Sequence, residues 1–239
     1  MTKLMFIDDA YIRDADAQVF AITDEGGIIL DASIFYATGG GQPGDSGTLT
    51  WKGGGIDIAT AVKGAGGTII LIPSEPNPLP AVGVKVKQSL NWERRHHHMR
   101  VHTALHLLSA VISQPVIGGS ISSEKGRLDF DMPDAIANKV ILENSVNKLI
   151  NCNLDISTEW VDESELVPNI KMLKTMSVAP PKEARRIRIV RIGAGENIAD
   201  YQPCGGTHVR NTSEIGRVSL GKVEKKDKQH RRVYLHLNT

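Results

Sequence analysis

The sequence lacks any long apolar run. No stretch of about 18 consecutive apolar residues occurs, so no membrane-spanning helix is expected. The first ten residues include Asp8 and Asp9 and show no signal-peptide pattern. The whole chain of 239 residues has two cysteines, Cys152 and Cys204. Two cysteines are too few for a disulfide framework and are typical of a reducing compartment, so we expect a cytoplasmic protein.

A large excess of charge of either sign is also absent. The 28 basic residues face 27 acidic ones, and the formal net charge is +1. Global charge therefore gives no argument for nucleic-acid binding, and only local clusters of basic residues can give one. Hydrophobic residues make up 41% and charged residues 23%, as in a globular protein with one large domain or two small ones.

The first ninety residues have the pattern of short strands. Apolar runs alternate with clusters of glycine and proline, and this spacing is typical of a small barrel or sandwich. The runs are residues 19–22, 28–30, 56–58, 68–72 and 82–86. We predict a small β-barrel domain over residues 1–90.

The apolar period changes from about Asn91, where helical spacing begins. One helix is predicted from Trp92 to Ser113, and Gln114-Pro115 ends it. A second helix is predicted from Pro133 to Ile150, with Ile136, Val140 and Val146 on one face. Strands are predicted over residues 154–160, 187–192, 217–223 and 232–237. In the first of them Leu154, Ile156, Thr158 and Trp160 alternate with polar residues, as on the covered face of a half-buried strand. Residues 91–239 therefore read as an α+β domain with helices against an antiparallel sheet.

Two histidines lie four residues apart on the first predicted helix. His102 and His106 share one face there, so their imidazoles can converge on one point. Cys204 and His208 have the same spacing in a loop whose two glycines allow a tight fold. Three imidazoles and a thiolate suit a tetrahedral zinc ion. Spacing alone leaves His98 open as an alternative ligand, because it lies four residues before His102.

These motifs resemble those of a known family. The segments 102–108 (HTALHLL) and 204–209 (CGGTHV) resemble the zinc motifs of the editing domain of alanyl-tRNA synthetase and of the stand-alone AlaX editing proteins. The glycine-rich segment 39–45 and the segments 119–131 and 214–233 also agree with the family. Asp129 departs from it, since a basic or neutral residue is expected there. The resemblance runs from about residue 33 to the end and is closest to the medium-length members.

The resemblance implies a fold, a metal and a reaction. The second domain would have the fold of the second additional domain of threonyl- and alanyl-tRNA synthetases, with zinc held by His102, His106, Cys204 and His208. The reaction would be hydrolysis of serine or glycine from the acceptor end of the alanine tRNA, without an aminoacylation domain. The role of zinc stays open between activating water, gripping the substrate and holding the pocket together. The alternatives are a zinc-stabilised tRNA-binding module without catalysis and the editing of threonine tRNA.

Three residues outside the ligand set are candidates for catalysis. Gln42 lies in the glycine-rich segment, which we expect to form a loop facing the zinc pocket across the domain boundary. Ser120 is a candidate for sensing the hydroxyl of a seryl group, as are Ser122 and Ser123. Asp200 lies four residues before Cys204 and can orient a ligand imidazole. Thr103 neighbours a ligand but is expected to point about 100° away from it on the helix.

Basic residues cluster locally despite the neutral total. Such clusters are the expected footprint of a phosphate backbone, so we predict tRNA contacts there. Arg94 and Arg95 lie at the start of the histidine helix, ahead of the histidine pair, and a further group lies among residues 182–191. The predicted contacts near the end of the chain are Lys222, Lys225, Lys226, Arg231 and Arg232.

Overall fold

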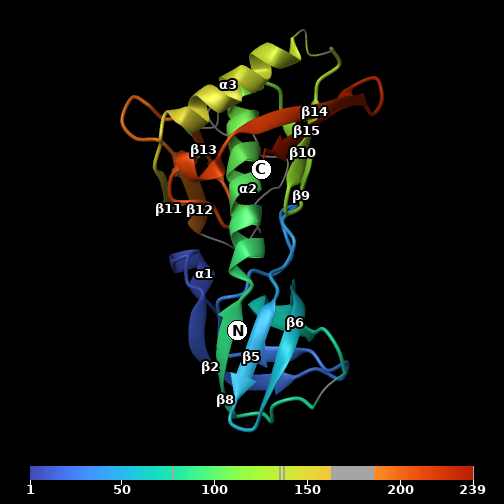
Figure 1. The fold of residues 1–239 in the computed structure, drawn as a ribbon, viewed down its shortest axis with the longest axis vertical. Helices are drawn as coiled ribbons and strands as arrows, with labels where there is room; N and C mark the ends of the chain where they lie inside the picture. The colour runs from blue at the N-terminus through green and yellow to red at the C-terminus, as the bar shows by residue number, and fades with distance from the viewer. Residues whose placement is uncertain (77, 135, 137, 163–185, 239) are drawn as a thin grey trace. The chain divides into compact units, whose positions relative to one another are not determined.

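The computed structural model divides the chain into two compact units, Met1–His98 and Met99–Thr239. It describes all residues except 77, 135, 137, 163–185 and 239 (Figure 1). The division falls inside helix α2 (Trp92–Val111). No described helix is long and apolar enough to cross a membrane.

The first unit is built on a closed six-stranded barrel. Its strands follow each other around the barrel in the order β2-β3-β7-β6-β5-β8. The short elements β1 (Lys3–Leu4), α1 (Met5–Asp8) and β4 (Ala32–Ser33) precede or join these strands. The barrel strands are β2 (Asp14–Ile22), β3 (Ile28–Leu30), β5 (Gly47–Trp51), β6 (Gly54–Lys63), β7 (Ile69–Pro73) and β8 (Lys85–Leu90). The predicted barrel is confirmed, although β5 was not expected because its glycine-rich surroundings hide the strand pattern.

The glycine-rich segment before β5 forms a tight turn. Gly40 and Gly41 have φ angles of 57° and 82°, which residues with a side chain rarely adopt. Their neighbours Gly39 and Gln42 exchange backbone hydrogen bonds of 3.0 Å. A Cβ atom on Gly44 would meet the carbonyl oxygen of Ala61 at 2.2 Å, so the chain can pass β6 there only with glycine. The backbone geometry alone therefore requires glycine in this motif.

Two antiparallel sheets and two α-helices make up the described part of the second unit. One sheet has the order β14-β15-β10-β9 and the other β11-β12-β13, and in Figure 1 they flank α2. Their strands are β9 (Val116–Ile121), β10 (Lys125–Asp131), β11 (Ile156–Asp162), β12 (Arg186–Ile192), β13 (Asp200–Pro203), β14 (Val218–Lys225) and β15 (His230–Leu237). The α+β class is thereby confirmed.

The second predicted helix is shorter than expected. Helix α3 (Lys139–Asn151) begins after Asn138, whose side chain accepts hydrogen bonds from the first turn. The face it buries consists of Leu142, Val146 and Ile150, and Val140 is 63% exposed. The prediction that Val140 faces the core is therefore wrong, because the face against β14 and the short helix η3 (Thr212–Ile215) has a strict four-residue spacing.

Strand β11 has the predicted phase at its start and the opposite phase at its end. Ile156 is half-buried as expected, but Thr158 and Trp160, which were expected on the same face, are exposed. Val161 instead packs against Ile187 and Ile189 of β12. The strict two-residue alternation that was predicted therefore fails after Ser157.

Candidate metal site

Helix α2 and the loop after β13 carry the four predicted ligands. His102 and His106 lie one turn apart on α2. Pro203 at the end of β13 pairs with Ile189 of β12, and the next residue, Cys204, donates its backbone N–H to the carbonyl oxygen of Arg188 at 3.1 Å. The sheet thus fixes where the loop begins.

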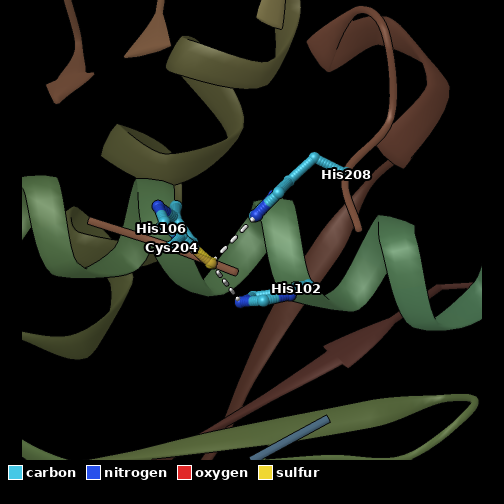
Figure 2. Close-up of side chains that lie close together, drawn as sticks. All are labelled: His102, His106, Cys204 and His208. Carbon is cyan, nitrogen blue, oxygen red and sulfur yellow. Dashed lines mark hydrogen bonds between the residues drawn. The ribbon is translucent and has the colours of Figure 1, made fainter. Parts of the chain in front are cut away.

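The four side chains meet at one point, which Figure 2 shows. Their donor atoms all lie within 4.8 Å of one another, and we call this set the metal cluster: His102, His106, Cys204 and His208. The sulfur of Cys204 is 3.5 Å from Nε2 of His102 and 3.3 Å from Nε2 of His208. Bonds of about 2.0–2.3 Å to a tetrahedral zinc ion give donor separations of roughly 3.3–3.8 Å. These two separations fit the edges of such a tetrahedron.

Asp200 orients the ring of His106 through a hydrogen bond. Its Oδ2 lies 2.7 Å from Nδ1 of His106, and both side chains are buried. The amide of Gln202 donates to the same carboxylate oxygen at 2.7 Å. Because a carboxylate accepts, Nδ1 of the ring carries the proton and Nε2 is left for a metal.

Thr103 holds His208 in the same way. Its hydroxyl donates to the carbonyl oxygen of Met99 at 2.9 Å, and its oxygen lies 3.2 Å from Nδ1 of His208. Since the hydroxyl proton is already used, Nδ1–H of the ring donates to Thr103. The expectation that Thr103 points away from the site is wrong. The angle of about 100° describes the direction of Thr103 relative to His102 on the same helix. The ligand that Thr103 contacts is His208, which comes from another segment of the chain.

Arg188 fastens the loop that carries Cys204. Its Nη1 donates to the carbonyl oxygens of Cys204 and Gly206, at 2.7 and 3.1 Å. The side chain is buried, with 8% of the residue exposed. The interpretation of Arg188 as part of a surface cluster for phosphate is therefore wrong, and Lys182 and Arg185 of that cluster lie outside the described residues.

The electrostatics of the cluster match what a metal requires. Burial would raise the pKa of Cys204, but the neighbouring rings of His102 and His208 bring it well below its usual value and favour the thiolate. Burial, together with His102, lowers the pKa of His208 to about 3, so this ring is neutral. Burial also opposes a charge on His106, yet hydrogen bonds to Asp200 and Cys204 raise its pKa to about 10. Metal binding would therefore release a proton from His106.

The structure places the other catalytic candidates on β9, in the turn after it and in the first unit. Ser120 lies partly exposed on β9, opposite Arg127 of β10. Ser122 closes its own turn by donating to the carbonyl oxygen of Lys125 at 2.9 Å. Gln42 is buried in the first unit, and its position relative to the metal cluster stays a prediction, since each unit is described by itself.

Two of the predicted tRNA contacts have other partners. Arg95 is fully buried in the first unit and is paired with Asp45, so the prediction that it contacts phosphate at the surface is wrong. Arg232 donates to both carboxylate oxygens of Asp129, at 2.6 and 2.8 Å. Burial would raise the pKa of Asp129, but Arg232 and Arg127 lower it overall. Asp129, unexpected at this position, is thus the partner of two arginines.

Family models match both units and define the class. Residues 187–234 match the threonyl and alanyl tRNA synthetase second additional domain, and residues 7–94 match the class II (A) tRNA synthetases. The fold, the metal cluster and these matches place the chain in the class of proteins related to alanyl-tRNA synthetase.

Whole-chain relatives narrow this class to a family. An alanyl-tRNA editing protein AlaX-M of Methanosarcina acetivorans is 32% identical over 99% of both chains. An AlaX-M protein of Saccharolobus solfataricus is 34% identical over 98% of both chains. An alanine–tRNA ligase of Pyrobaculum arsenaticum is 32% identical over 94% of this chain but only 25% of its own length. The chain belongs to the AlaX family of alanyl-tRNA editing proteins.

Proposed function

We propose that this protein hydrolyses the ester bond between a wrong amino acid, serine or glycine, and the terminal ribose of the alanine tRNA. The observation that carries the proposal is the convergence of four donor atoms within 4.8 Å, in a chain similar throughout to proteins named for alanyl-tRNA editing. Because the substrate is the tRNA of translation, we place the reaction in the cytoplasm.

Zinc is the metal that the donor set fits best. One thiolate and three imidazoles suit a borderline-soft ion, and the donor separations fit a tetrahedron. Bound there, zinc would supply positive charge and Lewis-acid character beside the ester. The protein's own part is to fix a proton on Nδ1 of two of the rings, so that Nε2 is the nitrogen available to the metal. Asp200 does this for His106 and Thr103 does it for His208.

The test is deacylation of seryl-, glycyl- and alanyl-tRNA by the pure protein, with and without a chelator. We expect seryl-tRNA to be cleaved at least about a hundredfold faster than alanyl-tRNA, because a pocket that bonds the seryl hydroxyl is left unsatisfied by a methyl group. Chelation should abolish the activity. In Cys204→Ala, activity should fall by orders of magnitude while circular dichroism and tRNA binding are retained, and each factor of ten equals about 1.4 kcal/mol.

Each contrary result has a definite meaning. Equal rates on seryl- and alanyl-tRNA would make the protein a general esterase. Intact tRNA binding with no hydrolysis, followed by unfolding on chelation, would identify a zinc-stabilised binding module. Preferential hydrolysis on threonine tRNA would assign the threonyl type of editing.

A further inference from the structure

A basic hollow lies between α3 and the β14–β15 hairpin of the second unit. Its volume is about 380 Å³, and its lining consists of four cations, two apolar residues and a glycine: Lys139, Lys222, Lys225, Arg231, Ile136, Val223 and Gly221. None of these lining residues is acidic. The hollow therefore concentrates positive charge on a molecule whose net charge is only +1.

Two of the four cations face each other directly. Lys225 and Arg231 are cross-strand partners in the antiparallel pairing of β14 with β15. Like charges in that position destabilise a hairpin. Lys225 forms no ion pair with a described residue, and Arg231 donates to the backbone carbonyls of Pro133 and Asp134 rather than to a carboxylate. Neither charge of this pair is thus compensated by a carboxylate of a described residue, although their repulsion weakens the hairpin.

The other two cations approach from either side. Lys139 is the first residue of α3, whose first turn contains no acidic residue, and its Nζ donates to the carbonyl oxygen of Gly221 at 3.3 Å. A positive charge at the start of a helix is unfavourable against the helix dipole. Lys222 is 75% exposed and pairs with Glu224 at 2.9 Å. Among the described residues, Lys222 is thus the one cation of the four that forms an ion pair.

We propose that this hollow binds the sugar-phosphate backbone of the tRNA. The arrangement is costly to the folded protein and complementary to an anion, and it includes the basic side chains that a phosphate backbone requires. This inference rests on the proposed function, because that function supplies the RNA. It adds Lys139 to the predicted contacts and removes Arg232, which is neutralised by Asp129. Lys226 of the same hairpin does not line the hollow.

The experiment compares tRNA affinity across a series of chloride concentrations for two variants. Lys139→Gln/Lys225→Gln neutralises two cations of the hollow. Lys148→Gln is the matched control, since Lys148 lies exposed at the other end of α3. In the double variant we expect the slope of log K against log salt to fall by about 0.9 per lost duplex contact, and affinity to fall about three- to tenfold per lysine. The control should equal the wild type.

Further readouts separate this inference from the proposed function. In the double variant the KM for seryl-tRNA should rise in step with the lost affinity, whereas the Lys148→Gln control should keep the wild-type KM. Wild-type affinity and slope in that variant would overturn the inference while leaving the enzyme intact. Tight binding by a wild type that hydrolyses no ester would overturn the proposed function alone. Inorganic phosphate is the second probe. If phosphate raises the melting temperature of the wild type but not of the double variant, while the tRNA affinity of the variant is unchanged, the hollow is a site for free phosphate and the inference fails.

Charge reversal adds a second variant that should remain folded. Lys225→Glu places a carboxylate opposite Arg231, so the hairpin gains an attractive cross-strand pair. We expect an unchanged or higher melting temperature together with weaker tRNA binding than in Lys225→Gln. Unchanged tRNA binding in a folded Lys225→Glu protein would contradict the inference.

Discussion

At the scale of single residues, the metal cluster depends on side chains that never reach the metal position. Asp200 and Thr103 each fix the proton on one ligand ring. Arg188 holds the backbone that carries the thiolate and brings a buried positive charge to it. These three residues position the ligands, and their removal should act through metal affinity.

Arg188→Met tests this role. Methionine retains much of the stem but has no donors and no charge, so the carbonyl oxygens of Cys204 and Gly206 lose a shared partner. We expect zinc affinity to fall about 10- to 100-fold, the range typical of groups that orient metal ligands. Competition with a chelator of known affinity measures it, and the cobalt-substituted protein should retain its thiolate charge-transfer band.

The control is Arg191→Met on the same strand. Arg191 pairs with Glu159 of β11, and its guanidinium lies over the ring of Tyr201. Its loss should leave zinc affinity unchanged. If Arg188→Met binds zinc as tightly as the wild type does, the arginine is only a buried packing residue.

At the scale of elements, a buried ion pair joins the start of α2 to the rest of the first unit. Arg95 and Asp45 are 0% and 1% exposed. Nε of Arg95 lies 3.0 Å from both carboxylate oxygens, and its terminal nitrogens donate to the carbonyl oxygens of Ala10 and Ile34 at 2.8 and 2.7 Å. The pair therefore connects α2, the glycine-rich segment and the chain before β2.

Asp45→Asn should destabilise the first unit by about 3–5 kcal/mol, because Arg95 remains as an uncompensated buried charge. Urea unfolding followed by circular dichroism measures the change. Asp57→Asn on β6 is the control, because Asp57 is exposed and its replacement should change stability by less than about 0.5 kcal/mol. Similar stability losses in both variants would show that Arg95 finds another partner.

At the scale of the whole molecule, His98 should make stability depend on pH. It is 1% exposed, and its Nδ1 has no hydrogen-bond partner among the described residues. Burial, followed by the charge of Arg94, lowers its pKa from 6.5 to about 4, with further lowering by Arg95 and His97 and an opposing effect of Asp45. Between these two pKa values the unfolded chain binds a proton that the folded chain does not.

Stability should therefore fall as the pH drops through this window, by about 3 kcal/mol in all from this residue. His98→Gln should lose this component, so the wild type minus variant difference in urea midpoint should change between about pH 7 and about pH 5. His97→Gln, at a half-buried neighbouring position, should retain the wild-type dependence. An identical pH dependence in His98→Gln and the wild type would show that His98 is protonated in the folded protein.

Local pattern was sufficient for several features of this protein. Spacing on a helix predicted which histidines share a face, and the structure brings His102 and His106 together with Cys204 and His208. Alternating apolar runs predicted the barrel and the final hairpin, because a strand or helix displays its own period in a few consecutive residues. The local period did not predict which face of α3 is exposed or which residues at the end of β11 are covered, since each depends on the segment that packs against it.

The sequence by itself determined the class of fold and the motifs able to bind a metal, because both depend on spacing within short segments, although spacing alone left His98 open as an alternative to His106. Only the tertiary structure decided what the individual polar side chains do. Arg95 and Arg188 have the same chemistry as the surface arginines, yet each is buried by partners far away in the chain. The partner of Thr103, His208, lies 105 residues further on. Burial and pairing across such distances arise from packing, and no local period encodes them.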